Sequence, residues 1–170
     1  MLFRSSRNAR SEEARRSLDE ASNRIAAMAA AQQVLYGAAD AARFNARQFL
    51  DAVCNTVRQT FTSDVDIACE AVDAKLPNDA AMPLALILNE LVTNAVKHGA
   101  NGRGEAAVRV GLTRRDGGFV LYVEDDGAGF DPEAVRERSS GLQLVQGLAR
   151  QLRGKFEVTR TPTRCSVQFS

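Results

Sequence analysis

The sequence has no tryptophan, one histidine and three cysteines among its 170 residues. Cys54, Cys69 and Cys165 are odd in number, lie far apart and form no Cys-x-x-Cys pair, which favours reduced thiols over a disulfide framework or a zinc site. No uninterrupted apolar run approaches the ~20 residues that a helix needs to cross a bilayer. The first residues also lack the apolar core of a signal peptide. We therefore expect a cytoplasmic protein with no membrane insertion.

The chain also lacks a net charge of either sign, because 22 basic residues stand against 21 acidic ones and leave +1. Whole-chain charge therefore predicts no polyanionic partner. Residues 1–16 hold five arginines against two glutamates, but Phe3 is the only aromatic residue among them. Without interleaved aromatic residues, the segment is predicted to be a solvated helix start rather than a nucleic-acid arm.

The length allows one good hydrophobic core with a helical appendage. A helix is predicted over 12–36 from a heptad-like seam and a second one over 46–61. The seam consists of Leu18, Ala21, Ile25, Met28, Gln32 and Leu35. It is too short and too polar for a free coiled coil, so it predicts a bundle helix. This helix should pack against a second copy of the chain, giving a homodimer, or fold back on the helix over 46–61.

The remaining pattern alternates strands and helices. Strands are predicted over 65–69, 106–114, 118–125, 155–160 and 164–169, a loop over 76–79, and helices over 80–98 and 141–152. Asp116-Gly117 is typical of a hairpin turn. The order predicts an α/β sandwich, a mixed sheet covered on one face by helices and preceded by a helical segment.

The helix over 80–98 carries a polar stripe of Glu90, Asn94, Lys97 and His98 on one side of an otherwise apolar helix. The Asn94 amide oxygen is a hard ligand suited to magnesium, and Lys97 offers a point charge for phosphate. Glu90 could orient or deprotonate an attacking group. The alternative is a solvated face whose polar side chains only satisfy each other.

A turn of sequence Asp125-Asp-Gly-Ala-Gly129 follows the strand over 118–125. A carboxylate at a buried strand end could accept a hydrogen bond from an exocyclic amine such as that of adenine. Gly127 and Gly129 let the backbone pass close to a planar ring. Such a turn alone is equally well an ordinary loop, but together with the helical stripe it indicates a site for a magnesium-bound nucleotide.

Ser139-Ser140-Gly141-Leu142 opens the helix over 141–152. The free backbone N–H groups of a helix start can hold phosphate, with a serine as the cap. A plain N-cap without a ligand is the alternative.

In that order, the three segments resemble the N, G1 and G2 boxes of histidine-kinase ATP-binding domains. Residues 20–36 resemble the second helix of the dimerisation hairpin in sensor kinases of the HWE and HisKA_2 type. The resemblance implies a Bergerat-type fold, with residues 1–45 as the remnant of the hairpin and its linker and 46–170 as the catalytic domain. It implies ATP and Mg²⁺ as cofactors.

The resemblance also implies a role for each matching residue. Asn94 would ligate Mg²⁺ with the catalytic Glu90 beside it, and Lys97 and His98 would face the phosphates and the ribose or base. Asp125 would bind the adenine amine, in a pocket shaped by Gly127 and Gly129. Residues 131–140 would form an ATP lid, and the phosphate-facing helix would begin with Ser140, Gly141 and Leu142.

Three departures from the family pattern matter. Ser139-Ser140 replaces a glycine of the G2 box, and the Trp-x-Glu signature of the HWE group is absent. The hairpin histidine that accepts phosphate is also absent, since His98 is the single histidine. The resemblance therefore implies transfer of the ATP γ-phosphoryl group to a histidine supplied from elsewhere, either because the chain is a fragment or because it lost that helix.

The implied partners are a response regulator and the phosphoacceptor helix of a full-length kinase. Two alternatives stay open from the sequence: a Ser/Thr kinase of the anti-sigma type, and a degenerate kinase-like adaptor that acts by protein contact.

Overall fold

The computed structural model describes residues 2–38, 42–61, 65–99, 107–127, 140–160 and 162–170, with side chains from residue 12 onward except those of 98 and 99. The elements are α1 (Leu2–Gly37), β1 (Arg43–Asn45), α2 (Ala46–Gln59), β2 (Asp66–Ala71), β3 (Lys75–Pro77), the 3₁₀ helix η1 (Asn78–Ala80), α3 (Ala81–Gly99), β4 (Ala107–Arg115), β5 (Gly118–Asp125), α5 (Ser140–Gln151), β6 (Lys155–Arg160) and β7 (Thr163–Phe169).

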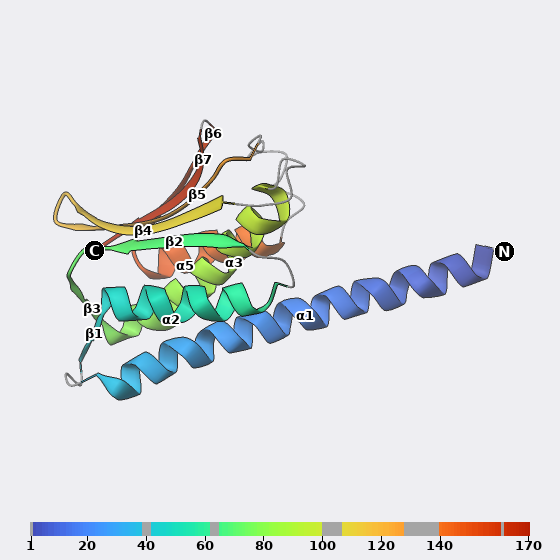
Figure 1. The fold of residues 1–170 in the computed structure, drawn as a ribbon, viewed down its shortest axis with the longest axis horizontal. Coiled ribbons are helices and arrows are strands. Elements are labelled where there is room, and N and C mark those ends of the chain that lie inside the picture. Colours follow the sequence, from blue (N-terminus) through green and yellow to red (C-terminus); the bar gives the residue numbers. More distant parts are fainter. Residues whose placement is uncertain (1, 39–41, 62–64, 100–106, 128–139, 161) are drawn as a thin grey trace.

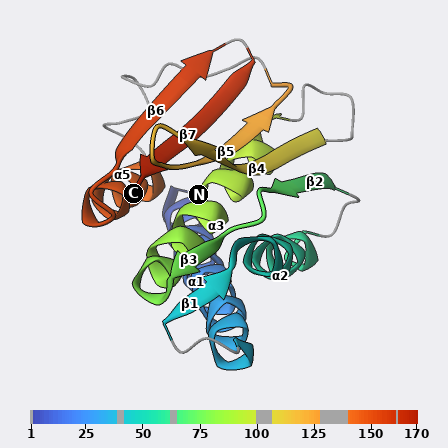
Figure 2. The same cartoon turned by 90° about the vertical axis from the view of Figure 1, so that its left-hand side faces the viewer.

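The main sheet has five strands in the order β2-β4-β5-β7-β6. It is mixed, because β2 pairs with β4 in parallel and the other neighbours are antiparallel. Helices α2, α3 and α5 lie on one face of this sheet, and α1 lies on the far side of the helix layer (Figures 1 and 2). The predicted α/β sandwich with a helical segment before it is confirmed.

The core lies between the sheet and the three helices. Successive side chains of a strand point to opposite faces, so the buried Leu121 and Val123 of β5 face the helix layer. They belong to one apolar cluster with Leu84 and Leu88 of α3 and Val145 of α5. This packing fixes α3, which carries the predicted polar stripe, against the middle of the sheet.

Helix α1 packs on α2 and α3 through Ala27, Ala30 and Ala31, and its N-terminal half extends past the sandwich (Figure 1). The predicted fold-back onto the second helix is confirmed. The predicted seam is wrong, however, because Leu18 and Ile25 are 70% and 62% exposed. The alanine face lets the helices approach closely, and apolar spacing alone did not distinguish it from the bulkier exposed face.

Two short strands were missed. β1 and β3 form a separate antiparallel pair in which Phe44 lies opposite Leu76. The predicted loop over 76–79 is instead the end of β3 followed by η1. Three residues are too few to show a strand period, so this pair could not be read from the pattern. The predicted hairpin is confirmed, since Asp116 and Gly117 both have positive φ, 47° and 82°.

Within the described residues, no helix is both long enough and apolar enough to cross a membrane.

Candidate functional site

The C-terminal half of α3 and the end of β5 lie at the same end of the sandwich (Figure 1). α3 contacts both β4 and β5. The structure therefore brings the predicted helical stripe and the predicted strand-end carboxylate to one end of the fold, although they are about thirty residues apart in the sequence.

Asp125 is the last residue of β5 and lies on the helix-covered face of the sheet. It alternates in phase with the buried Val123, and its ladder partners are Val108 of β4 and Thr163 of β7. One carboxylate oxygen, Oδ1, accepts a hydrogen bond from the backbone N–H of Gly127 at 2.8 Å. The turn after β5 therefore holds the carboxylate at the strand end, as the proposed adenine contact requires.

The negative charge of Asp125 affects a buried thiol on the helix-covered face of the sheet. The pKa of the Cys165 thiol is raised to about 12, first by burial and second by the negative charge of Asp125. Cys165 is one inward-facing position along β7 from Thr163. A carboxylate facing the core side, rather than solvent, explains this effect.

Thr163 lies beside the candidate site and was missed by sequence reasoning. It is buried, lies opposite Asp125, and its hydroxyl donates to the carbonyl oxygen of Gly127 at 3.4 Å. It therefore braces the same turn from the neighbouring strand. The pairing register of β5 with β7 would have been needed to find it, and the sequence carried no signal for that register.

Glu90 is held from two sides. The guanidinium Nε–H of Arg24 on α1 donates to Glu90 Oε1 at 2.7 Å, and the amide of Asn89 donates to the same oxygen at 3.3 Å. The Glu90 side chain is 12% exposed. The hydrogen bond to Glu90 also raises the pKa of Arg24. Arg24 is the second residue beside the candidate site that sequence reasoning missed, because its contact with Glu90 depends on how α1 docks.

Asn94 is half-buried one turn after Glu90, and within the described part of the chain its side chain makes no hydrogen bond. Lys97 is 48% exposed and lies 3.8 Å from a carboxylate oxygen of Glu20 on α1. Glu90 thus bonds to Arg24 and Asn89 rather than to Asn94. In the described residues, the polar side chains of the stripe therefore do not only hydrogen-bond to one another. The side chain of His98 lies outside the described residues.

At the third segment, Ser140 is the exposed first residue of α5, while Gly141 and Leu142 are buried. Since the Leu142 side chain is in the core, any contact that it makes with phosphate would come from its backbone. Gly129, Ser139 and the rest of the predicted lid before Ser140 lie outside the described residues.

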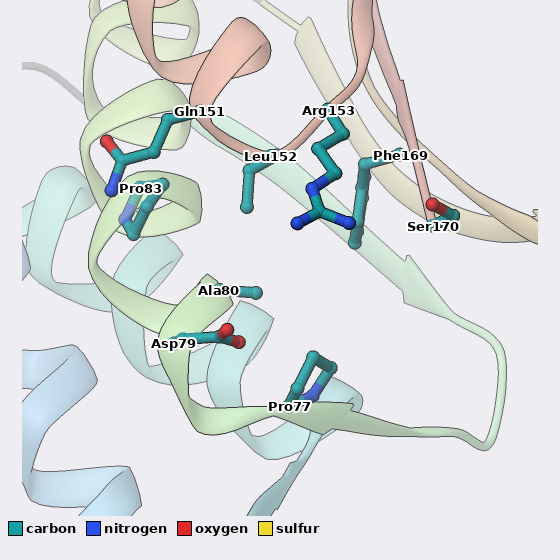
Figure 3. A pocket seen from close by; sticks show the side chains of 9 residues that line it. All are labelled: Pro77, Asp79, Ala80, Pro83, Gln151, Leu152, Arg153, Phe169 and Ser170. Carbon is teal, nitrogen blue, oxygen red and sulfur yellow. The ribbon is translucent and has the colours of Figure 1, made fainter.

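A pocket of about 370 Å³ lies at the opposite end of the sandwich (Figure 3). Pro83 in the first turn of α3, Arg153 after α5 and Phe169 at the end of β7 contribute to its lining. It includes none of the predicted site residues, so it is separate from the candidate nucleotide site.

Residues 6–170 match the family of the histidine kinase-like ATPase domain. The chain belongs to this family. It is 28% identical over 153 residues to the sensor histidine kinase PdtaS of Mycolicibacterium smegmatis, covering 87% of this chain and 30% of that protein. It is 27% identical over 145 residues to blue-light-activated histidine kinase 1 of Erythrobacter litoralis, covering 82% of this chain and 39% of the relative.

The nitrate/nitrite sensor protein NarX of Escherichia coli is 28% identical over 114 residues, 67% of this chain and 18% of NarX. This chain therefore spans well under half the length of these relatives. Among solved structures, the histidine kinase domain of an Erythrobacter litoralis blue-light-activated kinase superposes with a TM-score of 0.75 at 23% identity, covering 88% of this chain and 74% of that one. This likeness confirms the fold.

Proposed function

We propose that this chain is the ATP-binding catalytic part of a sensor histidine kinase, which transfers the γ-phosphoryl group of ATP to a histidine outside the chain. The observation that carries the proposal is that the C-terminal half of α3, which contains Asn94, and the end of β5, which is Asp125, lie at one end of the sandwich in a histidine kinase-like ATPase domain. Family membership gives no support to the anti-sigma-type kinase or to the adaptor.

The described residues fit a magnesium-bound nucleotide. Asn94 offers an amide oxygen that makes no hydrogen bond within the described part of the chain, which suits it to ligate Mg²⁺. Lys97 is exposed enough to reach phosphate, and Asp125 is held by Gly127 at the strand end to accept the adenine amine. Bound Mg²⁺ would neutralise part of the negative charge of the phosphates.

Three further assignments complete this proposal. Glu90, as the catalytic carboxylate, would orient or deprotonate the attacking imidazole. His98 and Gly129 would line the ribose or base, and the backbone at Ser140, Gly141 and Leu142 would face the phosphates. In the transfer, the bond between the γ-phosphorus and the bridging oxygen breaks, a P–N bond forms, and ADP leaves; the protein's contribution is positioning and charge stabilisation.

The proposal extends to organisation and partners. Residues 1–45 would be the remnant of a dimerisation hairpin with its linker and 46–170 the catalytic domain. The phosphoacceptor helix of a full-length kinase, a response regulator and a second copy of the chain would be its partners, in the cytoplasm where ATP is available.

Calorimetric titration with a non-hydrolysable ATP analogue, with and without Mg²⁺, tests the nucleotide site. We expect magnesium-dependent binding that is lost in Asn94→Asp, because a carboxylate there adds negative charge beside the phosphates. A wild-type chain that binds nothing at millimolar analogue would contradict the proposal and favour the adaptor.

The acceptor is tested by adding a separate histidine-bearing hairpin helix and radiolabelled ATP. A phosphoryl group on a histidine nitrogen is lost in acid, whereas one on a serine or threonine hydroxyl survives. Acid-stable label on the acceptor would replace the histidine-kinase proposal with the Ser/Thr kinase.

A further inference from the structure

Two ion pairs join α1 to α3 beside the candidate nucleotide site. Arg24 Nε lies 2.7 Å from Glu90 Oε1, and Glu20 Oε1 lies 3.8 Å from Lys97 Nζ. Glu20 and Arg24 are one turn apart on the same side of α1. Because the later residue of α1 meets the earlier residue of α3, the two helices run antiparallel here. We call these four residues the charge clasp.

The charge clasp engages both charged residues that the proposed function needs on the described part of α3. Lys97 would contact phosphate, and Glu90 would act on the incoming imidazole. Asn94, the proposed magnesium ligand, lies between them in the sequence. Glu20 also interacts with Arg24, since its negative charge is a further cause of the raised Arg24 pKa. The four charges therefore form one alternating network that reaches from α1 to the site.

The apolar part of the α1 interface near the clasp is small, so the ion pairs matter for α1 docking. Among the described side chains of α1, the buried apolar ones are the alanines at 27, 30 and 31, Val34 and Leu35 are partly buried near its C-terminal end, and every side chain from 12 to 20 is exposed. Alanine buries little apolar area, so the stretch of α1 next to the clasp is held weakly compared with an interface built from leucine. Within the described residues, the clasp is the attachment nearest the N-terminal half of α1, which Figure 1 shows extending past the sandwich.

We propose that α1 regulates the nucleotide site through the charge clasp, so that α1 docking and nucleotide binding oppose each other. This inference rests on the proposed function. Docked α1 keeps Glu20 on Lys97 and Arg24 on Glu90; ATP phosphates compete with Glu20 for Lys97. A movement of α1 along α3 changes both pairs at once. Linkage requires the effect to be reciprocal, so nucleotide also weakens α1 docking by the same factor.

The test is the affinity of the Mg²⁺-bound ATP analogue for the double variant Glu20→Gln/Arg24→Gln. This variant loses one negative and one positive charge, so the net charge is that of the wild type. We expect about fivefold tighter binding, at the low end of typical coupling between sites. The matched control is Glu12→Gln/Arg16→Gln, which has the same spacing and chemistry in the fully exposed part of α1, and its affinity should equal the wild type's.

Hydrogen exchange gives the reciprocal readout. In the wild type, the analogue should speed amide exchange in α1 around residues 20–31, whereas the double variant should exchange fast with or without it. If the double variant does not fold, the single variant Glu20→Gln repeats both measurements, since that side chain is 46% exposed.

The outcomes separate the two proposals. Equal or weaker nucleotide affinity in Glu20→Gln/Arg24→Gln, with wild-type binding intact, overturns the clasp and leaves the proposed function standing. A wild-type chain that binds no nucleotide overturns the proposed function and the clasp's regulatory role with it, whatever the exchange of α1.

Discussion

The neighbouring carboxylates Glu124 and Asp125 lie on opposite faces of the five-stranded sheet and have different surroundings. On the face without helices, Glu124 lies 2.8 Å from the guanidinium of Arg109 and 3.9 Å from that of Arg164. Arg164 also covers the ring of Tyr122 at 3.8 Å. On the helix-covered face, Asp125 holds the turn at Gly127 and stands at the candidate site.

The difference follows from the pleat of β5. One step along a strand turns a side chain to the other face, so two adjacent acids enter different surroundings. Glu124 pairs with arginines of both neighbouring strands, and these ion pairs link β5 to β4 and β7. Asp125 points toward the helix layer, where α3 brings Asn94 and Lys97 to the same end. The acid that we propose for the nucleotide site is therefore distinguished from its neighbour by strand phase and not by residue type.

The largest expected effect separates these two acids. Asp125→Asn should weaken binding of the ATP analogue about a thousandfold, because asparagine has one acceptor oxygen in place of two and cannot accept from both the Gly127 N–H and the adenine amine. Glu124→Gln is the matched control, with unchanged nucleotide affinity and a stability loss of about 1 kcal/mol, since its partner Arg109 is largely exposed. Calorimetric titration and denaturant unfolding measure the two.

Equal affinities for Asp125→Asn and the wild type, with the fold retained, would remove Asp125 from the site. A loss of binding in Glu124→Gln instead would mean that the open face of the sheet contributes to the nucleotide site and that the comparison is wrong.

The same contrast applies to packing. Leu121→Ala on the helix-covered face should lower the free energy of unfolding by about 3 kcal/mol, because the leucine is fully buried and leaves a cavity. Val120→Ala, one residue earlier on the open face, should cost about 1 kcal/mol or less. Urea denaturation monitored by circular dichroism measures both; equal costs would contradict the assignment of faces.

Much of this fold was readable from the sequence. The strands over 118–125 and 155–160 have the predicted bounds, because Gly117 precedes a continuous apolar run and Gly154 precedes a run that alternates apolar and polar residues. The five-strand sheet and its helix layer followed from the order of elements. The face of α1 did not, since alanines at 27, 30 and 31 bury themselves while the larger Leu18 and Ile25 stay in solvent.

The site was predictable only where its residues are local in the sequence. The stripe on α3 and the turn after β5 were found from spacing, and the structure brings Glu90, Asn94, Lys97 and Asp125 to one end of the molecule. Thr163 and Arg24 were missed because one depends on strand register and the other on helix docking. Both are long-range contacts, which a local pattern does not encode.

A third prediction concerns the cysteine on the helix-covered face of β7. The pKa of Cys165 is raised from its ordinary value of 9.0 to about 12, so between pH 9 and pH 12 the unfolded chain loses a proton that the native chain keeps. This group's contribution to stability is fully present below pH 9 and falls by about 1.4 kcal/mol per pH unit above it.

Urea denaturation of wild type and Cys165→Ala at pH 8 and pH 10 measures the effect as the difference between the two pH slopes. Alkylation adds a direct check: Cys69, whose pKa is lowered by a hydrogen bond from Cys54, should react with iodoacetamide before Cys165. Identical slopes for the two proteins would show that Cys165 is not buried as described.

The smallest expected effect tests how the turn at Gly127 is braced. Thr163→Val keeps the side-chain shape but removes the hydroxyl that donates to the Gly127 carbonyl at 3.4 Å. That long hydrogen bond should be worth about 1 kcal/mol or less in the free energy of unfolding, with a loss of nucleotide affinity of at most about fivefold. Thr163→Ser keeps the hydroxyl and should restore the affinity. A stability loss in Thr163→Val without any change in affinity would confine Thr163 to the sheet, and the turn would then owe its shape to Asp125 alone.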